Sequence, residues 1–270
     1  ELYLAWQKGP SGFKRQVVLK RILPQFASDP EFVQMFVNEA LIASSLTHPN
    51  IAHIYELLHE GDDYYIVMEY VKGWTIRDVL RQMGQRKERI PLPYVAQIIA
   101  AVCDALDYAY NERGPDGNPR LVVHRDVTPT NVLVCPDGQI KLVDFGIAKA
   151  LRRSENITRS RTLKGKYPYM APEQLRGEPV DHRSDIFSVG VMLHEMCTGR
   201  RLFRREGDMA TIRAVLEDPI ALPSQIVPDF PADLEAVIMR AVCRERDERY
   251  ATAHKLASHL RRSAQAHEWN

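Results

Sequence analysis

The ten residues "VVHRDVTPTN", from Val122 to Asn131, place an asparagine five residues after a His-Arg-Asp triplet, with a proline between them. A carboxylate beside a bound hydroxyl group can orient that hydroxyl and accept its proton, which is the role predicted for Asp126. The amide oxygen of Asn131 suits Mg²⁺, which favours oxygen ligands. Because phosphoryl transfer depends on positioning, metal ions and charge neutralisation, this spacing favours a phosphoryl-transfer loop.

Two further motifs follow in the order that this chemistry requires. Asp144 begins a "DFG" triplet 13 residues after Asn131, and its carboxylate would hold metal ions that bridge the phosphates. Alone the triplet is weak evidence, but in this order and between strand-like segments it is strong evidence. The triplet "APE" follows at 171–173, after a stretch rich in Ser, Thr and Arg. By itself that stretch would be a solvated loop, but its place between the two triplets indicates an activation segment.

A lysine and a glutamate precede these motifs. Lys20 ends the apolar, strand-like segment "VVLK", and Glu39 lies in a segment of helical periodicity. A lysine on a strand can hold the α- and β-phosphates of a nucleotide if an acidic side chain fixes its direction. Taken alone, such a pair is more often a solvated ion pair, but its place ahead of the other motifs favours the phosphate-binding role.

The composition is that of an ordinary soluble globular protein. The chain has 270 residues, of which 45% are hydrophobic and 26% charged, enough for one large domain or two lobes. With 36 basic and 35 acidic residues the charge is balanced, and we expect no nucleic-acid partner. The four cysteines form no CxxC pair and are expected to be thiols in a reducing compartment. Since no apolar run reaches about 18 residues and no signal peptide opens the chain, we expect a cytoplasmic location and no membrane contact within it.

Hydrophobic periodicity predicts a strand-rich first third and a mainly helical remainder. A capping box of Ser28 and Glu31 should begin the first helix, and Gly199 should end the helix over 185–198. The expected helices are 28–46, 75–83, 93–112 and most of the chain from 185 onward. The expected strands are 1–7, 15–23, 51–60, 64–71, 121–126, 131–135 and 139–144.

Together these motifs resemble the protein kinase superfamily and, more narrowly, the bacterial eukaryotic-like (Hanks-type) Ser/Thr kinases. Further matching pieces are "HPNI" at 48–51, "VMEYVKG" at 67–73 and "DHRSDIFSVGVMLHEMCTGRRLF" at 181–203. The resemblance covers essentially the whole chain. It implies an α+β, bilobal protein kinase fold, with a small β-rich N-lobe that includes the helix of Glu39 and a larger, mainly helical C-lobe. The N-lobe would cover residues 1–71 and the C-lobe residues 72–270.

The resemblance also implies roles for single residues. Lys20, paired with Glu39, would hold the phosphates of ATP, and Asp126 would be the catalytic base. Asn131 and Asp144 would bind Mg²⁺, with Mn²⁺ as an alternative metal. The adenine-binding residues would be Leu2, Val18, Met68 at the gatekeeper position, Glu69 and Val71 through their backbone, and Leu133.

Supporting contacts and control by phosphorylation are implied in the same way. Asp185 would brace the backbone of the His-Arg-Asp triplet, and Arg249 would pair with Glu173. Arg125 adjoins the catalytic aspartate and would be neutralised by a phosphate on the activation segment. The implied partners are ATP, a protein substrate that the sequence does not identify, and a second copy of the chain for autophosphorylation in trans. The candidate phosphorylation sites are Thr162, Thr158, Ser160 and Ser154.

One departure from the family pattern lies at the start of the chain. The GxGxxGxV loop that covers the phosphates is absent, because Glu1 and Leu2 align with its last two positions. True loss of this loop would favour a weak kinase or a pseudokinase, and we prefer the interpretation that the sequence starts past the loop. Many bacterial relatives continue into a membrane span and a sensor domain. The cytosolic part of a membrane-anchored receptor kinase is therefore a second localisation for this chain.

A second departure concerns Thr128, which stands where Ser/Thr kinases usually have lysine, two residues after the catalytic aspartate. The later segment "GKYPYMAPE" has Lys166 where the family usually has threonine. We therefore hypothesise an exchange in which Lys166 reaches the γ-phosphate and Asp126, with Thr128 as its hydrogen-bonding neighbour. In the alternative, Lys166 faces solvent or substrate and the loss of the loop lysine is tolerated.

The expected function is transfer of the ATP γ-phosphate to Ser or Thr hydroxyls of proteins, with autophosphorylation of the activation segment. Pro129 favours Ser/Thr over Tyr, although the lost threonine near 166 weakens that preference. A pseudokinase scaffold is the first alternative, and the intact set of predicted catalytic residues argues against it. A small-molecule phosphotransferase of related fold is the second, and it would lack the activation segment and the APE motif.

Overall fold

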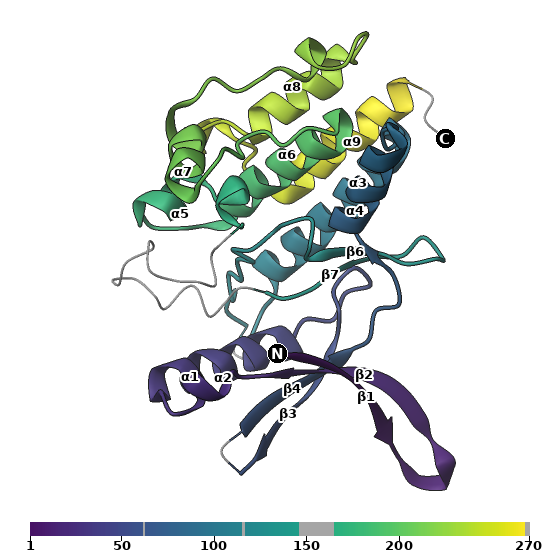
Figure 1. Cartoon of the computed structure of the whole chain (residues 1–270), viewed down its shortest axis with the longest axis vertical. Helices are drawn as coiled ribbons and strands as arrows, with labels where there is room; N and C mark the ends of the chain where they lie inside the picture. Colours follow the sequence, from purple (N-terminus) through teal and green to yellow (C-terminus); the bar gives the residue numbers. More distant parts are fainter. Residues whose placement is uncertain (62, 115–116, 146–164, 268–270) are drawn as a thin grey trace.

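The computed structural model describes residues 1–61, 63–114, 117–145 and 165–267, and these form two lobes (Figure 1). A sheet and two helices make up the small lobe at the bottom of Figure 1, and the larger lobe above it is mainly helical. The strands β6 and β7 lie where the two lobes meet. This architecture confirms the expected α+β, bilobal fold.

The small lobe is built on one antiparallel sheet with the strand order β1-β2-β4-β3. Its strands are rich in β-branched and aromatic residues, which pack well on a half-buried pleated surface. Leu2, Leu4 and Trp6 share one face of β1, and this face is exposed to solvent. The strands are β1 (Leu2–Lys8), β2 (Lys14–Arg21), β3 (Ile54–Glu60) and β4 (Asp63–Glu69).

Helix α2 (Pro30–Ser44) packs against β3 and carries Glu39. Phe36, Ala40 and Ala43 from this helix belong to the apolar cluster that fills the space between helix and sheet. Because Glu39 is itself buried, its carboxylate is presented to the interior of the lobe rather than to solvent.

The predicted capping box at the start of this helix is wrong. Asp29, and not Ser28, is the N-cap, and its carboxylate accepts a hydrogen bond from the backbone N–H of Glu31 at 3.0 Å. Ser28 instead ends a separate short helix, α1 (Pro24–Ala27). An ionised aspartate at the N-cap also complements the positive end of the helix dipole, which explains why it takes this position from the neighbouring serine.

The connection between the lobes runs beside a second, three-stranded sheet. In this sheet β5 (Trp74–Thr75) pairs with β6 (Val132–Val134), which pairs with β7 (Ile140–Leu142). Gly73 in the connection has no room for a side chain, because a Cβ atom there would lie 2.5 Å from the carbonyl oxygen of Val134. The glycine therefore lets the two backbones approach closely.

Of the three short strands predicted around the catalytic loop, two are confirmed as β6 and β7. The strand predicted over 121–126 is wrong, since no strand is formed by these residues. Leu121 and Arg125 have left-handed backbone angles, with φ of 51° and 63°, which a regular strand cannot contain. The stretch before the catalytic aspartate is therefore held by side chains instead of by strand pairing.

The large lobe packs its helices around α6 (His182–Thr198), which is buried along nearly its whole length. Gly199 ends α6 in the left-handed conformation, as predicted. The other helices are α3 (Ile76–Arg86), α4 (Leu92–Asn111), α5 (Pro172–Arg176), α7 (Asp208–Glu217), α8 (Ala232–Ala241) and α9 (Ala253–Ala266). Short 3₁₀ turns are η1 (Pro10–Gly12), η5 (Tyr167–Tyr169), η6 (Pro223–Gln225) and η7 (Arg246–Glu248).

Helix α4 is the one described helix whose length and composition would also allow it to cross a membrane. In the structure it is a core helix that packs against α6 and α9, and 56% of its 18-residue apolar stretch is buried inside the protein. Burial within the lobe accounts for its apolar character.

A buried ion pair joins Arg249, which follows the η7 turn, to Glu173 on α5. Arg249 is fully buried and donates two hydrogen bonds to the carboxylate of Glu173, at 2.7 and 2.9 Å, which confirms the predicted pair. Burial opposes the charged form of Glu173. The bonds and charge of Arg249 and a bond from the Ser184 hydroxyl outweigh this effect and hold the pKa of Glu173 below its ordinary value. The stability that Glu173 contributes is therefore present above its unfolded pKa of 4.5 and is lost as pH falls through the lowered folded value.

Arg249→Ala is expected to lower the free energy of unfolding by about 3–5 kcal/mol, because it leaves the buried Glu173 carboxylate without its cation. Arg213→Ala is the matched control, since Arg213 forms an exposed pair with Glu217 on α7, and it should cost no more than about 0.5 kcal/mol. Urea denaturation at pH 7 measures both values. Equal losses for the two variants would contradict the structural importance of the buried pair.

Candidate active site

The backbone of the His-Arg-Asp triplet is held by a buried carboxylate from α6. Asp185 accepts hydrogen bonds from the backbone N–H groups of His124 and Arg125, both at 2.7 Å. Burial raises the pKa of Asp185 to about 7, while these two N–H groups favour its charged form. The positive φ of Arg125 is a strained conformation for a residue with a side chain. The two bonds to Asp185 stabilise it and so fix the loop that carries Asp126.

The ring of His124 connects the catalytic loop to the DFG motif. Its Nδ1 accepts a hydrogen bond from the backbone N–H of Asp126 at 3.2 Å, so the neutral ring carries its proton on Nε2. The Nε2–H group then donates to the carbonyl oxygen of Val143 at 3.1 Å. The same ring packs against Phe145, with 4.6 Å between the ring centroids. These contacts place Asp144, between Val143 and Phe145, beside the loop.

Asp126 and Asn131 are brought together within the loop. The amide group of Asn131 donates to the backbone oxygen of Asp126 at 2.9 Å and to its Oδ2 at 3.2 Å. Asp126 is 7% exposed, so its carboxylate faces the site and not bulk water. This arrangement uses the nitrogen of Asn131 for positioning. From the described residues its Oδ1 accepts only a long bond of 3.4 Å, from Thr130, which leaves this oxygen for another partner.

Lys166 approaches the same carboxylate from the segment before the APE motif. Its Nζ lies 2.5 Å from Oδ2 of Asp126, directly before the η5 turn. The hydroxyl of Thr128 lies 2.8 Å from the hydroxyl of Thr130, and no described hydrogen bond joins it to Lys166. The structure therefore brings Lys166 and Asp126 together, whereas the expected hydrogen bond between Thr128 and Lys166 is not formed among the described residues.

Lys20 is joined to both predicted acidic partners. Its Nζ lies 2.6 Å from Oε1 of Glu39 on α2 and 3.3 Å from Oδ1 of Asp144 after β7. Burial disfavours the ammonium group, but the charges of Asp144 and Glu39 outweigh this and raise the pKa of Lys20 above its ordinary value. The lysine is therefore a fixed positive charge between the lobes, which suits a group that holds phosphate.

Two oxygen donors in this site fit a hard divalent cation. Asn131 Oδ1 is an amide oxygen, and the Asp144 carboxylate is 31% exposed with Lys20 on one of its oxygens. The backbone N–H of Val143 donates to the carbonyl oxygen of Asn131 at 2.9 Å, which keeps the two donor segments together. Among the described residues no cluster of three or more His, Cys, Asp or Glu could hold a metal ion alone. Asn131 and Asp144 would supply two of the oxygen ligands of Mg²⁺, which usually takes its others from water and substrate phosphates.

The residues predicted to meet adenine lie on β1, β2, β4, β6 and the connection between the lobes. Met68 is buried in the small-lobe core and pairs across the sheet with Val18, which in turn pairs with Leu4. Val71 and Leu133 are half-buried, while Leu2 is 61% exposed. The structure therefore pairs Val18 with Met68 close to the connection that carries Val71, and it places the exposed Leu2 opposite Lys20 in the sheet rather than beside Val18.

Sequence reasoning missed the contact that fixes Glu69. Its carboxylate accepts hydrogen bonds from Lys141 Nζ and from the backbone N–H of His53, both at 3.0 Å. Lys141 is 8% exposed although it lies on β7 in the large lobe. A lysine inside the strand-like run "QIKLVD" is the signal that could have indicated a buried partner, because lysine is rarely buried unless it is paired.

The candidate phosphorylation sites Thr162, Thr158, Ser160 and Ser154 lie outside the described residues, as does the glycine of the DFG motif.

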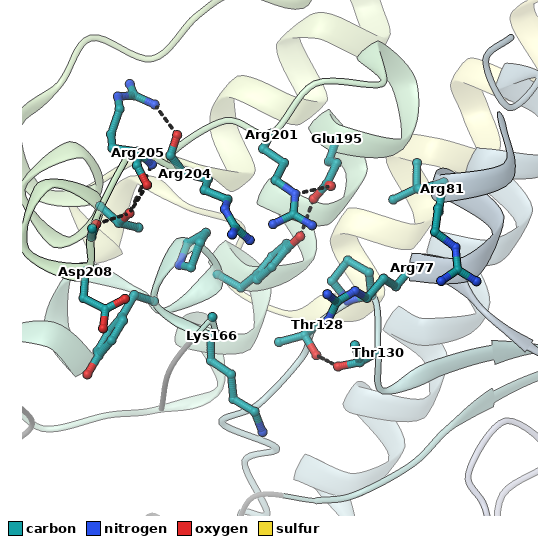
Figure 2. Close-up of a pocket in the computed structure, with 18 of the residues that line it drawn as sticks. Arg77, Arg81, Thr128, Thr130, Lys166, Glu195, Arg201, Arg204, Arg205 and Asp208 are labelled. Carbon is teal, nitrogen blue, oxygen red and sulfur yellow. Dashed lines mark hydrogen bonds and ion pairs between the residues drawn. The ribbon is translucent and has the colours of Figure 1, made fainter. Parts of the chain in front are cut away.

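A pocket of about 820 Å³ opens beside the catalytic loop (Figure 2). Thr128, Thr130 and Lys166 line its end next to Asp126, and the walls come from α3, η5 and the segment between α6 and α7. This pocket was not predicted from the sequence. The arginine-rich run "GRRLFRR" and the arginines four residues apart on α3 were signals that could have indicated it.

Where its two lobes meet, the fold brings together a lysine paired with two carboxylates, the Asp126 carboxylate and the Asn131 amide, an arrangement typical of a phosphotransferase. The family model described as "Protein kinase domain" matches residues 11–260, and the chain belongs to the protein kinase family.

Curated relatives and solved structures agree with this membership. The chain is 44% identical to the tyrosine-protein kinase MasK of Myxococcus xanthus, over 96% of this chain and 40% of that protein. It is 35% identical to the serine/threonine-protein kinase PrkC of Bacillus subtilis, over 95% of this chain and 38% of that protein. The chain thus spans about two fifths of the length of these relatives. The PknI kinase domain of Mycobacterium tuberculosis superposes with a TM-score of 0.71 at 27% identity, covering 97% of this chain and 90% of that one.

Proposed function

We propose that this chain is the catalytic domain of a protein kinase that transfers the γ-phosphate of ATP to Ser or Thr hydroxyls of proteins. The observation that carries the proposal is the position of Lys20, whose ammonium group contacts both Glu39 on α2 and Asp144 after β7. This bridge joins the small lobe, its helix and the predicted metal ligand in one assembled cleft. A pseudokinase scaffold would have no need of such an assembled set.

In the proposed reaction the acceptor hydroxyl lies beside Asp126, which orients it and accepts its proton. The hydroxyl oxygen forms a bond to the γ-phosphorus while the bond from that phosphorus to the leaving ADP oxygen breaks. Mg²⁺, held by Asn131 and Asp144, would neutralise charge on the phosphates when bound, with Mn²⁺ as an alternative. Lys20, oriented by Glu39, holds the phosphates in line with the acceptor.

Lys166 takes the role of the missing loop lysine in this proposal. Its ammonium group lies 2.5 Å from the Asp126 carboxylate, where the charge of the transferring phosphate would develop. A flexible ammonium group is a suitable point charge for phosphate. Thr128 then serves the loop through its contact with Thr130 and not through Lys166.

The acceptor residue separates this proposal from its nearest competitor. The name of PrkC and the loop proline support Ser/Thr, whereas the name of MasK supports Tyr. The purified chain should be incubated with γ-labelled ATP, Mg²⁺ and dephosphorylated casein, followed by phosphoamino acid analysis. Label on serine and threonine supports the proposal. Label confined to tyrosine would reassign the acceptor, and label on a sugar with none on protein would favour a small-molecule phosphotransferase.

The active protein is expected to carry phosphate on at least one of Thr162, Thr158, Ser160 and Ser154. The physical reason is charge, because Arg125 directly precedes the catalytic aspartate and the stretch itself is rich in arginine. Mass spectrometry before and after phosphatase treatment measures the phosphate, and activity should fall when it is removed. A fully active protein with no phosphate on this stretch would refute the expectation.

Trans-autophosphorylation by a second copy would supply this phosphate.

We propose that the lobes divide between residues 71 and 72. We also propose that the chain acts in the cytoplasm, either free or as the cytosolic part of a membrane-anchored kinase. The four cysteines among the described residues are free thiols, which fits a reducing compartment.

A further inference from the structure

The pocket beside the catalytic loop, called here the basic pocket, has a strongly positive lining (Figure 2). Of its titratable lining side chains, six carry positive charge and two carry negative charge. A cleft lined by one sign of charge concentrates the field and attracts the opposite charge. The positive residues are Arg77, Arg81, Lys166, Arg201, Arg204 and Arg205, and the negative residues are Glu195 and Asp208.

Glu195, one of the two acidic side chains, already has partners within the protein. Glu195 is 6% exposed, accepts a hydrogen bond from the hydroxyl of Tyr169, and lies 3.5 Å from Nε of Arg201. Its carboxylate is therefore not available to a basic side chain of a substrate. Arg201 is likewise occupied by this buried partner, so the pair contributes little net charge to the pocket.

The remaining arginines differ in how far they are engaged. Arg205 pairs with Asp218 at 2.8 Å, and Arg81 pairs with Asp78 at 3.0 Å. Arg77 and Arg204 are exposed, and within the described parts of the chain their guanidinium groups take part in no hydrogen bond or ion pair. These two side chains are the cations that a ligand could engage without breaking an existing pair.

The positions of these two arginines are set by the fold. The backbone N–H of Arg77 donates to the carbonyl oxygen of Pro129 at 2.9 Å, which fixes the start of α3 to the catalytic loop. Arg204 follows the buried Phe203 in the segment between α6 and α7. In Figure 2 the two arginines come from different walls of the basic pocket, with Thr128 and Lys166 nearby.

We propose that the basic pocket selects protein substrates with an acidic side chain close to the acceptor hydroxyl, and that Arg77 and Arg204 bind this side chain. The inference rests on the proposed function, because it names the class of substrate for that same site. An acceptor residue at Asp126 places its neighbours in the pocket, since an extended peptide advances only about 3.3 Å per residue. Guanidinium groups bind carboxylate and phosphate in the same bidentate way, so the acidic group is aspartate, glutamate or a phosphorylated residue.

Matched serine peptides test the proposal. The peptides differ in the residues within three positions on both sides of the serine. These residues are glutamate in the first peptide, glutamine in the second and lysine in the third. In the fourth peptide they include one phosphoserine. We expect kcat/KM for the glutamate peptide to exceed that for the glutamine peptide about tenfold at low salt, and the ratio should shrink as salt is added. The phosphoserine peptide shows whether phosphate is preferred to carboxylate.

Variants assign the effect to the two arginines. Arg77→Ala with Arg204→Ala should reduce kcat/KM for the glutamate peptide to the value for the glutamine peptide, while the latter stays unchanged. Arg86→Ala is the matched control, because Arg86 is exposed on the same helix, α3, and lies outside the lining of the pocket. Equal kcat/KM for the glutamate and glutamine peptides, or a preference for the lysine peptide, would overturn the proposal.

A binding measurement separates this inference from the proposed function. Fluorescently labelled peptides with alanine in place of serine cannot accept phosphate, so their anisotropy reports binding without catalysis. Tighter binding of the glutamate peptide, lost in the double variant, supports the pocket even if no peptide were phosphorylated. Equal binding of glutamate and glutamine peptides by a protein that phosphorylates both would overturn the pocket and leave the kinase function intact.

Discussion

Asp126→Asn is expected to lower kcat by about two to four orders of magnitude, the range that a positioned general base contributes. Asparagine has the shape of aspartate and can keep the contact with Asn131, but it cannot accept the proton of the acceptor hydroxyl. It also loses the ion pair with Lys166. Nucleotide affinity should change little, because the Lys20 and Glu39 pair is untouched. Steady-state transfer to casein gives kcat, and titration with a fluorescent ATP analogue gives the affinity.

Asp137→Asn is the matched control for this experiment. Asp137 is an exposed aspartate in the turn between β6 and β7, close in sequence to the loop, and its loss should leave kcat within about twofold of the parent value. An Asp126→Asn protein that binds nucleotide and turns over ATP at the parent rate would contradict the assignment of the base. A parent protein that binds nucleotide but transfers no more phosphate than the Asp126→Asn variant, with both at background, would instead favour a pseudokinase.

Lys166→Ala is expected to lower kcat by about two to three orders of magnitude, since it removes a preorganised charge from the site of transfer. The ammonium group contacts the Asp126 carboxylate directly, so its loss removes a positive charge from beside the proposed site of transfer. Transfer rates with saturating ATP and peptide isolate kcat. Lys255→Ala on the exposed face of α9 is the control and should be neutral.

The double exchange Thr128→Lys with Lys166→Thr sharpens this test. If position 166 supplies the charge that position 128 usually supplies, the double variant should recover activity that Lys166→Ala or Lys166→Thr alone has lost. The competing role for Lys166 is contact with substrate, which would raise KM for the peptide and leave kcat unchanged. Near-parent kcat for Lys166→Ala would refute the exchange.

The contacts within the Asp126–Asn131 loop could be anticipated from sequence, because they depend on residue types at a fixed local spacing. Asp126 and Asn131 are only five positions apart, so the short loop between them determines that their side chains meet. The pairing of Lys20 with Glu39 and with Asp144 was predicted by resemblance, since these residues are 19 and 124 positions apart. Their contact distances depend on the packing of two lobes, which periodicity does not describe.

Other features depend on competition between neighbours that sequence patterns do not resolve. Two residues suitable as N-caps, Ser28 and Asp29, stand side by side, and the structure uses the charged one. The strand expected over 121–126 fails because its backbone is held by Asp185, 60 residues away. Thr128 pairs with Thr130 instead of Lys166, because a hydroxyl two residues away lies within reach whatever the distant segment does. The basic pocket is assembled from segments far apart in the sequence and appears only in three dimensions.

The positive charge beside Asp126 comes from Lys166 in a distant segment, and this affects how kinase activity can be controlled. A lysine within the catalytic loop would stay near the carboxylate whatever the neighbouring segments did, but Lys166 reaches it from 40 residues further along the chain. The same segment supplies Tyr167, Pro168 and Tyr169 to the wall of the basic pocket. Undocking this segment would therefore remove the chemical group and the substrate platform in one movement. A kinase built in this way would have little residual activity while the segment is undocked.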